Sequence, residues 1–353
     1  MLLVDSTFTT RGFGGIAQDN RDFVIEFRKY INTLFLYDKN ATLENTSDKK
    51  LRYSMGKINA GALILNRTIK MLDWEGDYYQ THLTGLRYPN KNGRVFLRLH
   101  DIFPITNPEW FSWQGRKIFS LAASSLSENT TLVCNSKTTQ SFAKKNPFFS
   151  KFDSIVVPCK VDSVMNLSKP CGSCEFCRSG GPNAAFLLAV GTIEPRKNYQ
   201  RLIQGWQESK AYSSFKNLVI VGKPGWKSYQ TQKMILGDKS VVWISPCDFG
   251  LSHLFRTATA FISASLAEGF DIPSVLADNQ AIPSALSAID AHIEFCQGSK
   301  IFFDPNSKRQ ISVAIKKLGK ESRSDRPKAV DRNWHTVFEK FTNQVGIERD
   351  FYI

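Results

Sequence analysis

Short apolar runs and amphipathic stretches alternate along the second half of the chain. Each run is long enough for one strand buried on both faces, the pattern of a parallel sheet covered by helices. The runs occupy residues 186–190, 218–221, 241–244, 260–263, 282–287 and 299–303. Amphipathic stretches at 198–209, 227–236, 250–258 and 308–318 predict helices between and after them. This alternation predicts right-handed βαβ units.

The first half repeats the pattern less regularly. Strands are predicted at 1–4, 32–37, 76–81, 94–99 and 131–134, and helices at 16–29, 56–70 and 137–145. The polar residues 38–50 predict a loop. Both halves therefore indicate an α/β fold with doubly wound parallel sheets.

A composition change separates the halves. Residues 161–183 are rich in Ser, Gly and Pro and have little apolar periodicity, which is typical of a linker. We therefore expect one domain at 1–160 and a second at 184–334. In doubly wound domains, ligands bind beyond the carboxyl ends of the strands.

The linker carries a cysteine cluster, Cys171, Cys174 and Cys177, in a C-x2-C-x2-C spacing. Three thiolates are one ligand short of a tetrahedral zinc site, and Cys159 is a candidate for the fourth. Free thiols or an adventitious disulfide are the favoured alternatives. Metal binding by this cluster therefore stays a minor option.

Composition and net charge restrict the classes of binding partner that we expect. The 353 residues are 42% hydrophobic and carry a formal net charge of +14, which favours anionic partners. No signature of a nucleic-acid-binding module is present, so nucleic acid is not expected. No apolar run reaches the roughly 20 residues of a membrane helix. We expect a cytoplasmic protein, with peripheral contact at the inner face of a membrane as an option because aromatic residues lie near scattered cations.

Two loops after predicted strands combine residues suited to binding an anion and a hydroxylated ligand. In the first, Arg196 and Lys197 precede a helix that Asn198 is placed to cap. A strand end, two cations and a helix N-terminus together suit an anion. In the second, Glu268 and Gly269 precede a helix expected near Pro273. Gly269 permits close backbone approach, and Glu268 can accept hydroxyl hydrogen bonds.

These segments together resemble family 4 glycosyltransferases of the GT-B fold. The matching pieces in the second half are VGTIEPRKN (190–198), LVIVGKPGW (218–226), SPCDFGL (245–251), AEGFDIP (267–273) and IFFDP (301–305). Weaker matches are GGIA (14–17), LHDIFP (99–104), NSKTT (135–139) and the segment 333–341. The resemblance implies two Rossmann-like domains that face a central cleft, with a closing helix at 335–353 that packs back on the first domain.

The resemblance also implies an activity: retaining transfer of a hexose from a nucleotide-diphosphate sugar to a glycan or lipid-linked acceptor, as in polysaccharide biosynthesis. It points to GDP-mannose as donor and implies that neither a metal nor a cofactor is required. It assigns the catalytic positions to His100 and Glu268. Donor-binding positions are Gly14, Gly15, Arg196, Lys197, Gly269 and Phe270, with the two cations neutralising the donor diphosphate.

Two positions depart from the family's pattern. The second Glu of its Glu-x7-Glu motif, which usually holds the ribose, is Leu276 here, and Thr192 stands where many relatives carry Arg. Leu cannot accept hydrogen bonds from a ribose. The alternative is therefore a catalytically degenerate, glycosyltransferase-like binding or scaffold protein.

Overall fold

A computed structural model of the chain contains two compact units. It describes residues 2–5, 15–30, 33–36, 76–85, 93–161, 184–245, 248–298, 301–321 and 334–347. One unit comprises Met1–Lys160 and Asn333–Ile353, and the other Val161–Arg332. The expected loop at 38–50, the expected helix at 56–70 and most of the linker, with its three cysteines, lie outside the described residues.

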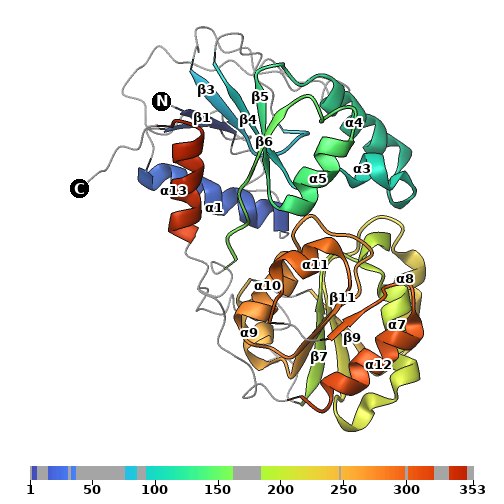
Figure 1. Cartoon of the computed structure of the whole chain (residues 1–353). Helices are drawn as coiled ribbons and strands as arrows, with labels where there is room; N and C mark the ends of the chain where they lie inside the picture. Colours follow the sequence, from blue (N-terminus) through green and yellow to red (C-terminus); the bar gives the residue numbers. More distant parts are fainter. Residues whose placement is uncertain are drawn as a thin grey trace. The chain divides into compact units, whose positions relative to one another are not determined.

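The first unit is built on a six-stranded parallel sheet of order β2-β1-β3-β4-β5-β6 (Figure 1). Its strands are β1 (Leu2–Asp5), β2 (Thr33–Leu36), β3 (Asp77–Gln80), β4 (Val95–Leu99), β5 (Thr130–Cys134) and β6 (Asp153–Val156). Its helices are α1 (Gly15–Tyr30), α3 (Phe103–Thr106), η1 (Pro108–Trp110), α4 (Trp113–Ser124), α5 (Lys137–Lys145) and α13 (Trp334–Gln344). The strand β6 and the helices α3 and α4 were not predicted from the sequence.

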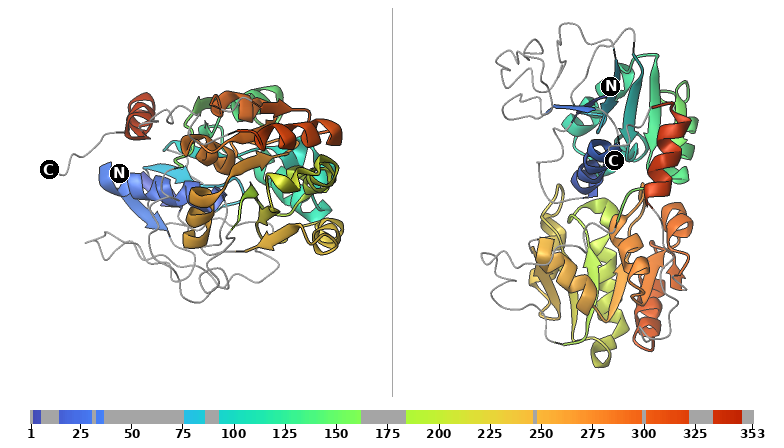
Figure 2. Two further views of the ribbon diagram at one scale, coloured as in Figure 1. Left: turned by 90° about the horizontal axis from the view of Figure 1, so that it is seen from below. Right: turned by 90° about the vertical axis from the view of Figure 1, so that its left-hand side faces the viewer.

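Two hydrophobic cores lie on the two faces of this sheet. On one face, Phe23 and Phe27 of α1 pack with Tyr79 of β3 and with Phe338 and Phe341 of α13. Ring centroids here lie 4.8 to 6.3 Å apart. The apolar faces of α1 and α13 therefore cover one side of the sheet, although more than 300 residues of sequence separate the two helices (Figure 2). Helices α4 and α5 contribute to the core on the other face.

The second unit has the same architecture. Its six parallel strands run in the order β12-β11-β10-β7-β8-β9. They are β7 (Phe186–Val190), β8 (Asn217–Val221), β9 (Val241–Ile244), β10 (Ala260–Ser263), β11 (Ser284–Ser287) and β12 (Ile301–Phe303). The helices are η3 (Pro195–Lys197), α7 (Tyr199–Ser209), η4 (Ala211–Ser213), α8 (Tyr229–Leu236), α9 (Asp248–Thr257), α10 (Ile272–Asn279), α11 (Asp290–Phe295) and α12 (Lys308–Leu318).

The apolar periodicity explains how these layers pack. Leu202, Ile203 and Trp206 of α7 are buried in a core shared with Leu187 of β7 and Ile311 of α12. On the opposite face, α9 reaches the sheet through Phe255, whose ring stacks on Phe261 of β10 at 6.0 Å. The expected α/β class with doubly wound parallel sheets is confirmed in both units.

Candidate functional site

A tight turn after β7 positions the first site residue of the second unit. Gly191 has a φ of +151°, and a β-carbon there would lie 2.7 Å from Cε of Lys197. The alkyl part of the Lys197 side chain therefore passes over the backbone of Gly191, where only a residue without a β-carbon leaves space for it. This crossing directs the lysine inward, and the residue is 8% exposed.

The ammonium group of Lys197 lies between two carboxylates. Its Nζ is 2.8 Å from Oε1 of Glu268 and donates a hydrogen bond of 2.9 Å to Oδ1 of Asp271. Burial alone lowers the pKa of a lysine. Here the negative charges of Asp271 and Glu268 outweigh burial and raise the pKa of Lys197 above its ordinary value. Lys197 is therefore a permanent buried cation.

Asp271 is the most strongly held group of this network. It has a φ of +62° directly before α10, and its side chain does not cap that helix. Its Oδ2 accepts hydrogen bonds from Ser274, from Ser263 at 3.0 Å, and from Nε2 of His292 at 2.9 Å. Burial would raise the pKa of Asp271, but Lys197 and His292 hold it well below its usual range. Asp271 is therefore ionised and fixed in place.

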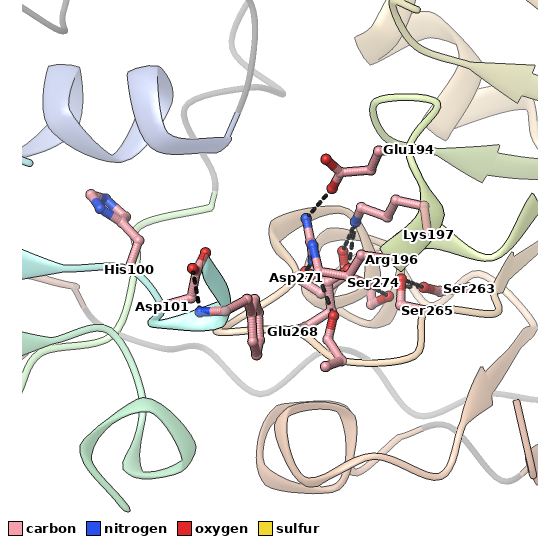
Figure 3. A network of polar contacts seen from close by, with 12 residues as sticks. His100, Asp101, Glu194, Arg196, Lys197, Ser263, Ser265, Glu268, Asp271 and Ser274 are labelled. Carbon is pink, nitrogen blue, oxygen red and sulfur yellow. Dashed lines mark hydrogen bonds and ion pairs between the residues drawn. The ribbon is translucent and has the colours of Figure 1, made fainter. Parts of the chain in front are cut away.

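Arg196 completes the network, which Figure 3 shows in close view. Its guanidinium donates to Oε1 of Glu194 at 2.6 Å and to the carbonyl of Ala267 at 3.0 Å, and it forms an ion pair with Glu268. Burial raises the pKa of Glu194, although Arg196 and Lys197 oppose the shift. The carboxylates of Glu194, Glu268 and Asp271 thus surround the two basic side chains. The sequence had instead predicted that Arg196 and Lys197 would be available to bind an anion.

Glu268 differs from the other two carboxylates in how it is held. It is 6% exposed, and the structure pairs it with Lys197 and Arg196. Its Oε1 lies 2.8 Å from Nζ of Lys197, and its Oε2 pairs with the guanidinium of Arg196. Of the three carboxylates, Glu268 is therefore the one that contacts both cations.

Asn198 precedes α7 but does not cap it through its side chain, which corrects the sequence prediction. It takes a left-handed conformation with a φ of +56°. Its side-chain amide donates instead to the carbonyls of Ala264 and Pro305, at 3.0 and 2.8 Å. The residue therefore ties the loop after β7 to the loops after β10 and β12.

In the first unit, His100 follows β4 and contacts a buried ion pair. Its Nε2 lies 3.0 Å from Oδ2 of Asp19. The same carboxylate accepts two hydrogen bonds from the guanidinium of Arg98, at 2.7 and 2.9 Å. Both charged residues are fully buried, and Arg98 also donates to the carbonyl of Val157 at 2.6 Å. Although burial opposes ionisation, Arg98 and His100 hold the pKa of Asp19 well below its usual range.

A second histidine lies close to His100. The ring centroids of His82 and His100 are 5.9 Å apart. Burial, with a smaller effect of His100, lowers the pKa of His82 to about 3. His82 is therefore neutral at physiological pH. Its Nδ1 accepts a hydrogen bond from the backbone N–H of Thr84 at 3.2 Å.

The remaining predicted site residues are distributed as follows. Gly15 is the first residue of α1, and Gly14 lies outside the described residues. Gly269 and Phe270 are buried beside Glu268, and the ring of Phe270 packs on Phe295 at 4.3 Å. The Phe270 side chain is therefore a core contact.

Leu276, which stands where the family's Glu-x7-Glu motif has its second Glu, is a core residue. Leu276 is buried in α10 at 1% exposure, where an apolar side chain is expected.

Within the described ranges, no group of three or more His, Cys, Asp or Glu side chains is arranged to hold a metal ion. Cys171, Cys174 and Cys177 lie outside those ranges.

Sequence reasoning missed several members of the two networks: Asp19, Arg98, Glu194, Ser263, Asp271, Ser274 and His292. One signal was available for Arg98, since it interrupts the apolar run VFLRL, and a charge inside a buried strand requires a partner. For Asp271 the signal was weaker. It was an acidic residue within AEGFDIP, directly before a helix that begins with Ile-Pro.

No described helix combines the length and the apolar character needed to cross a bilayer.

The second unit matches a known protein family. Residues 180–333 match the family described as Glycosyl transferases group 1. The serotype-specific mannosyltransferase WbdA of Escherichia coli is 27% identical over 261 residues, which cover 67% of this chain and 31% of WbdA. The O-antigen chain mannosyltransferase RfbU of Salmonella typhimurium is 29% identical over 138 residues, 38% of each chain. The chain thus spans about a third of the length of WbdA.

Solved structures share the fold. Sucrose-phosphate synthase from Thermosynechococcus elongatus superposes with a TM-score of 0.61 at 13% identity, covering 98% of this chain and 97% of that one. Anabaena HepE in complex with UDP and glucose gives a TM-score of 0.59 at 13% identity and covers 98% and 99%. At this identity the likeness concerns the fold alone, and it confirms a GT-B fold with two Rossmann-like domains.

Proposed function

From the glycosyl transferases group 1 domain that residues 180–333 form, we propose that the chain is a retaining hexosyltransferase. It transfers a sugar from a nucleotide-diphosphate donor to a glycan or lipid-linked acceptor. We propose mannose as the transferred sugar and GDP-mannose as the donor, because WbdA and RfbU are both described as mannosyltransferases. RfbU is described as acting on an O-antigen chain, which supports polysaccharide biosynthesis and a glycan acceptor.

The observation that carries this proposal is the buried network of Arg196, Lys197 and Glu268. Two fixed cations at the carboxyl edge of a parallel sheet supply counter-charge for a diphosphate, which is the leaving group in transfer from a nucleotide sugar. When a diphosphate takes these cations, Glu268 loses the partners that hold it. Its carboxylate then becomes available to accept hydrogen bonds from the hydroxyl groups of the donor sugar.

Asp271 keeps Lys197 in position while this exchange occurs. It stays bound to the ammonium on one oxygen, and Ser263, Ser274 and His292 hold the other. The cation is therefore preorganised and needs no rearrangement as charge develops on the leaving diphosphate. This division of roles assigns Asp271 to positioning and Glu268 to the ligand.

The test is transfer by the full chain. We expect it to add a hexose from GDP-mannose, rather than from UDP-glucose, to a mannose-terminated oligosaccharide, as detected by mass spectrometry. Proton NMR of the product should show the α-linkage that retention of the α-donor requires. A β-linked product would contradict retention, and transfer from UDP-glucose alone would contradict the donor assignment.

The second candidate function, a binding or scaffold protein without turnover, rests on buried, apolar Leu276. This side chain offers no acceptor for a ribose hydroxyl. Calorimetry with GDP, together with the transfer assay, separates the candidates. GDP binding without transfer would support the scaffold. A chain that shows no GDP binding and no transfer would contradict both candidates.

A stripe on α4 supports peripheral contact with the membrane that holds a lipid-linked acceptor. Trp113, Lys117 and Leu121 follow one another at helical spacing of four residues, and Trp113 and Leu121 are 61% and 41% exposed. The ammonium of Lys117 lies 5.0 Å from the Trp113 ring centroid. An amphipathic ring beside a cation suits an anionic lipid interface.

Replacing Trp113 and Leu121 by alanine is therefore expected to weaken binding to phosphatidylglycerol vesicles about tenfold or more, since a large buried side chain contributes about 1.5–3 kcal/mol. Co-sedimentation measures this change. Leu236→Ala on α8, at a leucine that is 79% exposed, is the control and should leave binding unchanged. Equal sedimentation of all three proteins would exclude the α4 stripe as the contact.

A further inference from the structure

A groove of about 540 Å³ lies between the edge strand β12 and the helix α12 of the second unit. Phe302 and Phe303 of β12 line it, together with Arg309, Val313 and Lys317 of α12. None of the residues that line this β12–α12 groove belongs to the network around Lys197. Ligand-binding sites have volumes of about 300–1,000 Å³, so the groove is large enough for several side chains of a binding partner.

The backbone of β12 has a free outer edge beside this groove. Among the described strands, β12 ends the second sheet, and β11 is its neighbour. The carbonyl of Phe303 accepts a hydrogen bond of 2.8 Å from the N–H of Ala288, which directly follows β11. Backbone groups point alternately to the two sides of a strand, so the N–H and C=O of Phe302 point away from β11. No described residue pairs with them, and they can therefore bind an added strand.

A side chain of α12 already binds this outer edge one step further along. Asp304 comes two residues after Phe302, so its N–H points to the same side. This N–H donates a hydrogen bond of 2.9 Å to Oε1 of Gln310. The outer edge of β12 is therefore within reach of polar groups that lie beside α12, and at Phe302 that place is open among the described residues.

The helix α12 presents two cations and an apolar side chain to the groove. Arg309, Val313 and Lys317 follow one another at a spacing of four residues, so they lie on one side of the helix, and all three are exposed. The helix contains no acidic residue. Lys308 pairs with Glu208, whereas Arg309 and Lys317 have no carboxylate partner in the described part of the chain. The groove therefore favours an occupant with two negative charges and an apolar group between them.

An extended peptide segment matches this arrangement in length as well as in charge. Only residues 304–307 separate β12 from α12, so the helix runs back along the strand with which it shares a core. Arg309 and Lys317 are about 12 Å apart along the helix axis. In an extended strand every second side chain lies on the same side, about 6.6 Å further on. Residues i, i+2 and i+4 of the segment therefore span about 13 Å, close to the separation of the two cations.

We propose that the β12–α12 groove binds an extended acidic segment of a partner protein, with an acidic residue at i, an apolar residue at i+2 and an acidic residue at i+4. The segment adds to the sheet through the backbone of Phe302, its acidic side chains pair with Arg309 and Lys317, and its apolar side chain packs on Val313.

Charge and backbone geometry favour this occupant over two others. A second copy of the chain would bring its own Arg309 and Lys317 against the same cations, and like charges across an interface oppose association. An anionic membrane would supply phosphates for the cations. It contains no peptide strand that could pair with the N–H and C=O of Phe302.

Fluorescence anisotropy with the full chain and the fluorescein-labelled peptide TDTFTET tests the proposal. We expect saturable binding that weakens as the salt concentration rises, because exposed charges are screened. The charge-reversed peptide TKTFTKT should not bind. Replacing the phenylalanine of the first peptide by serine should weaken binding about tenfold or more, since the burial of a large apolar side chain is lost.

Variants of the chain locate the binding site. Arg309→Ser combined with Lys317→Ser should weaken peptide binding about 5- to 20-fold, the combined effect of two exposed ion pairs. The matched control is Lys316→Ser, because Lys316 is an exposed lysine of the same helix that does not line the groove, and binding should stay unchanged. Phe302→Pro removes the outward N–H, a change that an edge strand tolerates, and should weaken binding with little change in melting temperature.

Each contrary result has a definite meaning. Absence of peptide binding, or equal binding to the wild type and to the Arg309 and Lys317 double variant, would overturn the proposal. A dimer in sedimentation equilibrium that Phe302→Pro dissociates would assign the groove to a second copy instead. Co-sedimentation with phosphatidylglycerol vesicles that depends on Arg309 and Lys317, without peptide binding, would assign it to a membrane. Since no measurement uses sugar transfer, the outcome is independent of the proposed function.

Discussion

Replacing Arg98 by methionine is expected to destabilise the first unit by about 3–5 kcal/mol, because it leaves the carboxylate of Asp19 buried without its cation. Arg98 is fully buried and makes two hydrogen bonds to Asp19. Urea titration followed by hydrogen exchange in peptides from β4 and β5 measures the change in this unit alone. The double variant Arg98→Met with Asp19→Asn should regain part of the lost stability, since no unpaired charge remains.

The same ion pair predicts how stability depends on pH. The pKa of Asp19 is held well below its usual range in the folded chain. Its contribution is therefore complete above about pH 4, the ordinary pKa of an unfolded aspartate, and is lost as the pH falls toward the folded pKa. The stability difference between wild type and Arg98→Met should thus shrink on acidification. A difference that is constant between pH 7 and pH 3 would exclude Asp19 as its source.

Lys197→Met is expected to reduce transfer by about 100- to 1,000-fold, the usual effect of removing one preorganised group that stabilises developing charge. GDP binding measured by calorimetry should fall with it. The variant also leaves Glu268 and Asp271 buried with less counter-charge, so its melting temperature should drop.

Two controls separate binding from folding in this experiment. Lys308→Met removes an exposed lysine of α12 that pairs with Glu208 at 2.6 Å, and it should change neither stability nor binding appreciably. Lys197→Met combined with Asp271→Asn should regain stability while transfer stays low. If the double variant regains GDP binding and transfer as well, Lys197 acts on folding rather than on the donor.

Local signals in the sequence were sufficient for the strands and helices that bury apolar faces. Runs such as Phe186–Val190 have few alternatives to a buried strand. The unpredicted helix α4 shows where that reasoning ends. It begins with a Ser112 cap on the N–H of Gly115, and its apolar face is short, with Phe119, Ala122 and Ala123 buried. So weak a periodicity does not distinguish a helix from an irregular segment.

The sequence by itself determined the α/β class, the parallel sheets and the loops that carry Arg196, Lys197, Glu268 and His100. These features depend on periodicity and on short motifs, which act over a few neighbouring residues. Only the tertiary structure decided the partners of those residues. Lys197 meets Asp271 across 74 positions of sequence and Arg98 meets Asp19 across 79. Buried charges must be paired, and which charges meet depends on how the strands are ordered and how the helices pack, information that no local pattern contains.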